Sequence, residues 1–169
     1  MPRVNIHSSE DIKSLTTFYS DNVTYQRHHE EIRFKGSQLI VTLSAALIAV
    51  LKFTSGSRVN FGIAVMIILL GLLGVAQVKK HSERADRHAR IARAYRKKIG
   101  EIAARHGATS VEEVHDAAAE AHKSRAGITC HLRARWFWLS VHIAIVAIGV
   151  AIGVLQIHDV FEIRRPAQN

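Results

Sequence analysis

Three runs of apolar residues, almost free of charge, alternate with strongly polar segments along the chain. They cover residues 37–53, 59–78 and 136–157. As an α-helix rising 1.5 Å per residue, the second run would extend for about 30 Å, the thickness of the hydrocarbon layer of a membrane. Three apolar helices of this length would leave a soluble bundle too little amphipathic surface to cover them. The pattern therefore predicts an all-α integral membrane protein with three spans.

A short turn containing Gly and Ser separates the first two spans, so these should form an antiparallel hairpin. The orientation follows from Lys and Arg: residues 79–135 carry 14 of them, whereas residues 158–169 carry two. Cytoplasmic loops are enriched in these residues. We therefore expect residues 1–36 and 79–135 in the cytoplasm and, after a third span, residues 158–169 outside. Residues 1–36 contain no signal-peptide core, so the first span should direct insertion.

Helical periodicity extends from the first span towards the N-terminus. From about residue 9 there is no Pro and no Gly before Gly36, and apolar or aromatic residues recur at spacings of three and four. A helix that enters the membrane directly is therefore expected. Asn22 and His29 lie within this seam, where they fit either register contacts between chains or a partly solvated seam.

The second span should also continue into the cytoplasm as one rod. Residues 85–106 repeat apolar residues and histidines at spacings of three and four. Gly107 can end this helix, and Thr109 with Glu112 forms a capping box for a returning helix. Residues 79–135 are therefore expected to form a cytoplasmic helical hairpin.

The net charge of +9 on 169 residues is concentrated next to the second span, where residues 79–98 carry nine basic residues. These are Lys79, Lys80, Arg84, Arg87, Arg90, Arg93, Arg96, Lys97 and Lys98. A cluster beside the membrane binds anionic lipid by roughly 1 kcal/mol per basic residue, and nucleotide or nucleic acid is the alternative ligand. The arginines recur every third residue and wind around a helix, which favours diffuse electrostatics over one pocket.

Catalytic and metal-binding motifs are missing from the sequence. The single cysteine, Cys130, excludes an intrachain disulfide and a zinc site built from paired cysteines. The chain lacks a phosphate-binding loop, a nucleophile elbow, a zinc-protease motif and a dinucleotide-binding turn. The 11 histidines do not have the spacing of a metal site. We therefore expect no enzyme activity, no cofactor and no bound metal.

Each span carries one stripe of small or polar residues at helical spacing. The candidates are Gln38 and Thr42 in the first span, Asn60 in the second, and His142, Gly149, Gly153 and Gln156 in the third. Small residues allow helices to approach closely, whereas polar residues within a span face protein or water rather than lipid. The stripes therefore fit either the lining of a pore or helix packing.

The segment TYQRHHEEIRFKG, residues 24–36, precedes the tight two-span hairpin and the long charged helix. This arrangement resembles the SLATT family of small bacterial membrane proteins, which are associated with nucleotide-signalling and anti-phage systems. The resemblance covers roughly residues 18–100 and rests on Tyr25, Arg27, His29 and Arg33; the family pattern does not require the third span. It implies an effector that oligomerises in the bacterial inner membrane and permeabilises it when a partner sensor signals infection.

Two classes of function therefore remain. The first is an oligomeric effector that permeabilises or depolarises the membrane on a signal from a partner. The second is a non-conducting scaffold or anchor whose cytoplasmic helical hairpin recruits a soluble partner. Membrane lipid, further copies of the chain and a soluble sensor protein are the expected partners.

Overall fold

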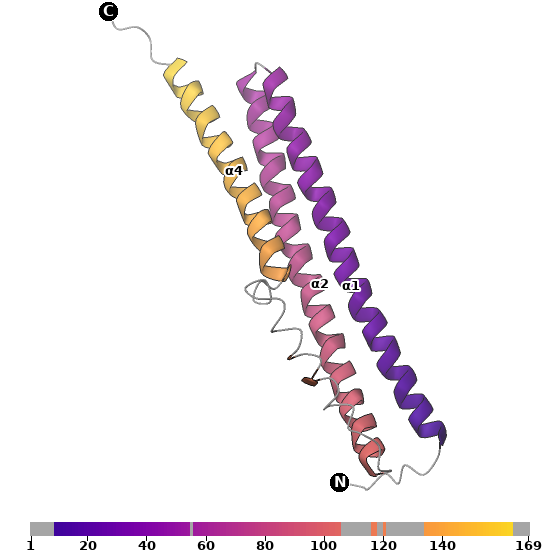
Figure 1. The fold of residues 1–169 in the computed structure, drawn as a ribbon. Helices are drawn as coiled ribbons and strands as arrows, with labels where there is room; N and C mark the ends of the chain where they lie inside the picture. The colour runs from indigo at the N-terminus through magenta and orange to yellow at the C-terminus, as the bar shows by residue number, and fades with distance from the viewer. Residues whose placement is uncertain (1–8, 55, 106–115, 118–119, 121–133, 164–169) are drawn as a thin grey trace, which may run out of the picture. The chain divides into compact units, whose positions relative to one another are not determined.

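The described residues of the computed structural model are 9–54, 56–105, 116–117, 120 and 134–163. Three long α-helices dominate these ranges (Figure 1): α1 (Ser9–Val50), α2 (Ser57–Arg105) and α4 (Ala134–Ile163). A 3₁₀ turn, η1 (Leu51–Phe53), follows α1 directly, and the described residues contain no strand. The predicted all-α class is confirmed.

Both predictions of a continuous helix are confirmed. α1 begins at Ser9 and continues without interruption into the first apolar run. α2 contains the second apolar run and the basic segment after it as one helix of 49 residues. Neither helix contains a proline, so nothing removes a backbone hydrogen bond along its length.

The hairpin connection differs in detail from the prediction. The α-helix of the first run ends at Val50, and residues 51–53 tighten into η1. The Thr54 hydroxyl bonds the Leu51 carbonyl oxygen at 3.4 Å and also pairs with the side-chain oxygen of Asn60. The backbone N–H of Asn60 donates to the Gly56 carbonyl oxygen, with 3.0 Å between nitrogen and oxygen, and closes the first turn of α2. Side chains at the end of η1 therefore stabilise the turn.

The third apolar run forms α4, which continues to Ile163. The predicted tail, residues 158–169, thus begins as helix, because α4 contains no proline to interrupt it. The predicted returning helix lies largely outside the described residues. By length and composition, α1, α2 and α4 are each apolar enough to cross a membrane.

The chain forms two compact units, each containing parts of α1 and α2. Unit 1 comprises Met1–Glu31 and Ser82–Leu132, and unit 2 comprises Ile32–His81 and Arg133–Asn169. In unit 1, the rings of Phe18 and Tyr95 stack with centroids 5.7 Å apart. His88 lies 3.0 Å from the Asn22 side-chain oxygen, so the predicted polar seam joins two helices of one chain.

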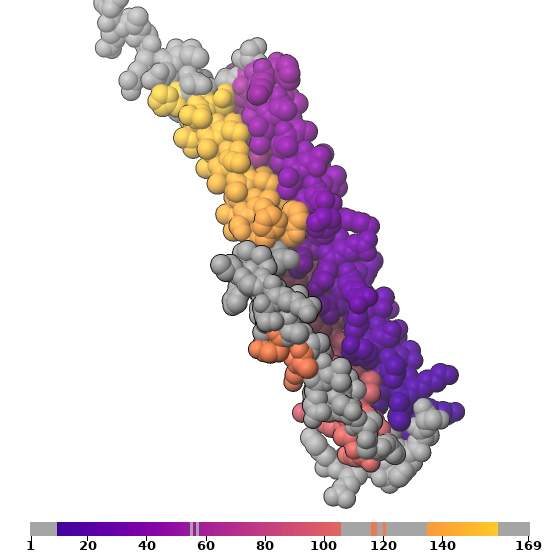
Figure 2. All heavy atoms as spheres, viewed as in Figure 1, coloured from indigo at the N-terminus to yellow at the C-terminus, as the bar shows by residue number. Residues whose placement is uncertain are grey.

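Unit 2 buries both apolar and polar side chains and exposes many large apolar ones. Its small buried core contains Ile40, Ile67 and Ile145, and its buried polar side chains are Ser37, Ser44 and His142. Large apolar side chains cover its exterior, as Leu39, Leu73 and Leu155 illustrate with 60–63% exposure. In Figure 2, α4 lies against α1, and the Phe34 and Trp138 rings meet edge to face. This distribution is the opposite of a soluble core and is compatible with a hydrocarbon environment.

Candidate functional site

Glycine on α2 allows the backbone of α4 to approach closely. Gly71 is buried, and a Cβ placed on it would lie 3.0 Å from the Val146 backbone nitrogen and 3.1 Å from the His142 carbonyl oxygen. Contacts this short to backbone atoms leave no room for a side chain. The α2–α4 interface therefore requires glycine at this position.

The contact is reciprocal, because α4 also presents glycine to α2. A Cβ on Gly149 would lie 3.1 Å from the Ala64 carbonyl oxygen and 2.8 Å from a side-chain carbon of Ile68. One turn further on, a Cβ on Gly153 would lie 3.8 Å from the Ala64 methyl group, an ordinary van der Waals contact. The stripe on the third span was expected to line a pore or to pack against a helix. At these glycines the structure contains helix packing.

His142 is fully buried among three helices. Its Nε2 lies 3.0 Å from the Ser37 hydroxyl of α1, and its ring lies over Gly74 of α2, where a Cβ would come within 2.6 Å of Cε1. The Nδ1 atom has no hydrogen-bond partner among the described residues. His142 is therefore a packing and hydrogen-bonding residue of unit 2, not a group that faces an open path through the chain.

A second polar contact joins α1 and α2 one turn away from His142. The side-chain amide of Gln77 donates to the Ile32 carbonyl oxygen at 3.3 Å. Gly36 makes room for this side chain, because a Cβ there would lie 2.7 Å from Gln77 Oε1. The lack of a side chain at Gly36 of α1 thus accommodates the Gln77 side chain of α2.

Gln38 and Thr42 face away from both α2 and α4. Both side chains are exposed, as are Ala45 and Ala49 on the same face of α1. The adjacent face of α1, which carries Ser37 and Ser44, is buried. The small and polar stripe on the first span is therefore left uncovered by the chain's own helices, unlike the stripes on α2 and α4. We name Gln38, Thr42, Ala45 and Ala49 the open face of α1.

The remaining two stripe residues do not join a common surface with these. Asn60 is half-buried at the start of α2, where it pairs with Thr54 of the turn. Gln156 is half-buried near the other end of α4. Within one chain, the glycines of the α2 and α4 stripes make helix-packing contacts.

Sequence reasoning missed Ser37, Ser44 and Gln77 as members of the buried polar set. Ser37 and Ser44 are separated by seven residues and so share a helix face, as Gln38 and Ala45 do. The two faces of α1 differ by about 100°. Periodicity alone offered no reason to choose between them, although the paired serines were a signal for the inner one.

The basic residues of the stalk are exposed, with one exception. Lys79, Lys80, Arg84, Arg87, Arg90, Arg93, Lys97 and Lys98 are all exposed. Arg96 is half-buried, and its Nε is buried without a hydrogen-bond partner among the described residues. Most basic side chains of the cluster are therefore exposed, as expected for arginines that wind around a helix, whereas Arg96 is not. No group of three or more potential metal-binding side chains occurs within the described residues.

Comparison of the chain with protein families, curated proteins and solved structures finds no match. The assignment of function therefore rests on the residues described above.

Proposed function

We propose that this chain is a multi-pass protein of the bacterial inner membrane that assembles into a homo-oligomer and permeabilises the membrane. In this proposal α1, α2 and α4 each cross the hydrocarbon layer, with residues 1–36 and 79–135 in the cytoplasm. The large apolar side chains exposed on unit 2 support insertion.

The exposure of Gln38 and Thr42 is the observation that carries the proposal. Their side chains lie in the apolar half of α1 and are not covered by α2 or α4. A polar side chain in hydrocarbon is unfavourable unless it meets protein or water. Ala45 and Ala49 on the same face let another helix approach closely. Several copies whose open faces converge would place Gln38 and Thr42 along a central path.

The cytoplasmic part supplies the connection to a signal. The resemblance of residues 18–100 to the SLATT family supports a partner sensor and a role in anti-phage defence. Unit 1 offers that partner a helical surface that is largely charged: Arg27 and Glu30 on α1 and Arg90 on α2 are exposed. The proposed mechanism is a change in the packing of these helices that opens the path between copies.

A non-conducting scaffold is the second candidate, and the α2–α4 interface favours it. Gly71 and Gly149 show that this chain buries small residues in close helix contacts. The open face of α1 could be buried in the same way between two copies. A scaffold would then recruit its soluble partner through the cytoplasmic helices without conducting.

The two functions differ in their response to an apolar open face. We expect the double variant Gln38→Leu/Thr42→Val to abolish depolarisation, because a hydrophobic constriction closes a pore by dewetting. The measurement is membrane-potential dye signal and dye uptake in bacterial cells after induction, at matched membrane abundance and oligomer size. The control variant Leu39→Ile/Leu43→Ile changes exposed residues of the same turns outside the open face and should conduct like the wild type.

Equal depolarisation by the apolar double variant and the wild type would contradict the pore. A wild-type chain that leaves the potential unchanged, even with its natural gene neighbours co-expressed, would leave the scaffold as the function. Loss of conductance in the control variant as well would assign the effect to packing rather than to the polar lining.

A further inference from the structure

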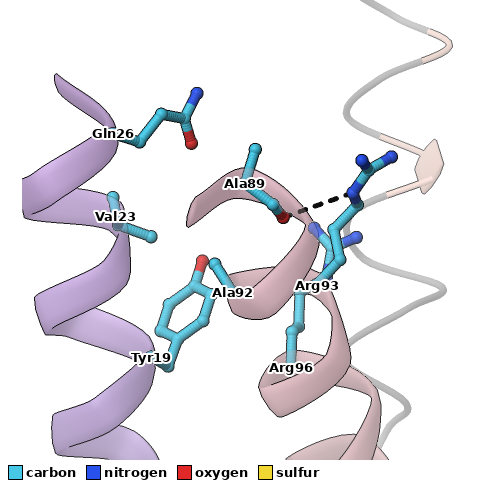
Figure 3. Close-up of a pocket in the computed structure, with 7 residues that line it drawn as sticks. All are labelled: Tyr19, Val23, Gln26, Ala89, Ala92, Arg93 and Arg96. Atoms are coloured by element: carbon cyan, nitrogen blue, oxygen red, sulfur yellow. Dashed lines mark hydrogen bonds between the residues drawn. The ribbon is translucent and has the colours of Figure 1, made fainter. Parts of the chain in front are cut away.

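Unit 1 contains a pocket between α1 and α2 that the proposed function does not use. It has a volume of about 380 Å³, and its lining residues are Tyr19, Val23, Gln26, Ala89, Ala92, Arg93 and Arg96. Figure 3 shows the three α1 side chains extending towards the turn of α2 that carries the two alanines. Because Ala89 and Ala92 have only methyl side chains, α2 leaves space here that a longer residue would fill. The volume is within the range of small-molecule sites.

Two guanidinium groups border this pocket without a counter-charge. Arg93 Nε donates to the Ala89 carbonyl oxygen at 3.3 Å, which holds its side chain along α2. Arg96 Nε is buried and has no partner among the described residues. Neither arginine forms an ion pair in the part of the chain that the structure describes. Figure 3 shows the two side chains next to each other, so their positive charges repel.

A buried N–H without a partner is unfavourable, and more so when the group is charged. Such a group in a native protein calls for an explanation, of which a bound ion is one. Arginine binds phosphate through pairs of parallel hydrogen bonds, and two adjacent guanidiniums suit its several oxygens. An anion in the pocket would offset the repulsion between the two arginines.

We propose that the unit 1 pocket binds the phosphate group of a phosphorylated organic ligand through Arg93 and Arg96. The Tyr19 hydroxyl and the Gln26 side chain supply polar contacts on the α1 side, where Gln26 already donates one hydrogen bond to Glu30 at 3.3 Å. Val23, Ala89 and Ala92 provide the apolar wall against which the organic part packs. The pocket thus combines the exposed Arg93 and the half-buried Arg96 with polar and apolar side chains of α1.

The phosphate could belong to a soluble metabolite or to a lipid headgroup. Arg93 and Arg96 lie about four and five helical turns beyond Val78, where the apolar run of α2 ends. This spacing along the helix favours a soluble ligand. Binding is independent of conductance, so the proposal stands or falls separately from the membrane function.

The test uses the full chain in nanodiscs of neutral phosphatidylcholine. Titration calorimetry with ATP and with inorganic pyrophosphate should detect binding to the wild type. Arg93→Gln/Arg96→Gln should weaken it at least tenfold. The matched pair Arg84→Gln/Arg87→Gln removes the same charge at the same spacing on α2, outside the pocket, and should change affinity less than threefold. Ala89→Leu fills the pocket without changing the charge and should also weaken ATP binding at least tenfold.

Equal losses in the two arginine pairs would overturn the pocket and assign binding to diffuse charge on the stalk. Absence of binding to both soluble probes would overturn a soluble ligand. In that case, retention by vesicles containing phosphatidylglycerol, lost only in Arg93→Gln/Arg96→Gln, would identify a lipid headgroup as the phosphate. Failure of every probe would overturn the site. Unchanged far-UV circular dichroism of each variant shows that the helices are intact.

Discussion

Gly62 and Gly71 lie in the same helix, α2, but in different surroundings. A Cβ on Gly62 would meet nothing within 4 Å, whereas one on Gly71 would press on the backbone of α4. Glycine costs helix stability relative to alanine at both positions, by about 1 kcal/mol. Only at Gly71 does close packing compensate for this cost.

Gly71→Ala is therefore expected to destabilise unit 2 by about 1–3 kcal/mol, because the added methyl group forces the α2–α4 backbones apart. Gly62→Ala, the matched control, should be neutral or stabilise the protein by up to about 1 kcal/mol. The measurement is the free energy of unfolding in mixed micelles for both variants. A Gly71→Ala protein as stable as its Gly62→Ala counterpart would mean that α4 does not lie on Gly71.

At the scale of the element, α1 has two polar faces, of which one is buried and the other is exposed. The face of Ser37 and Ser44 is buried, and that of Gln38 and Thr42 is open. Ser37 is held inside by its hydrogen bond to His142. A helix can present its open face to a second copy only if it crosses the membrane in a defined direction, so topology is the element-scale test.

Cysteine labelling tests the direction of each helix. In a Cys130→Ser background, Ser57→Cys and Gln168→Cys should react with an impermeant maleimide from outside, because the excess of Lys and Arg predicts that residues 79–135 are cytoplasmic. Ser20→Cys, exposed on α1, should react only after permeabilisation and serves as the control. Labelling at position 57 without labelling at position 168 would show that α4 does not cross the membrane.

At the scale of the whole molecule, unit 2 exposes many more large apolar side chains than it buries. Its described core contains three buried isoleucines, while large apolar side chains remain exposed on all three helices. Lipid can cover apolar side chains but not Gln38 and Thr42. Contact between copies through the open face of α1 is therefore the expected assembly.

Native mass spectrometry in mild detergent should detect a homo-oligomer of the wild-type chain. Ala45→Phe places a large ring on the open face and should shift the protein to monomers, because helix contacts of this kind require small residues. Ala147→Phe adds the same ring to an exposed position of α4 and should leave the oligomer intact. A monomeric wild type, or equal dissociation in both variants, would contradict assembly through α1.

The sequence by itself determined the helices. Uninterrupted apolar runs without proline predicted α1, α2 and α4, because backbone hydrogen bonding within a helix depends only on neighbours along the chain. Periodicity also showed which residues share a face, including the α1 seam that contains Asn22 and His29.

Only the tertiary structure decided which faces meet. Gln38 and Ser37 are adjacent in the chain, yet contact with His142 of α4 buries the serine and leaves the glutamine open. Arg93 and Arg96 belong to a winding row of arginines, but packing of α1 against α2 places this pair at one pocket. The rotation of a helix about its own axis is set by close approach to other helices, which residues distant in the sequence control.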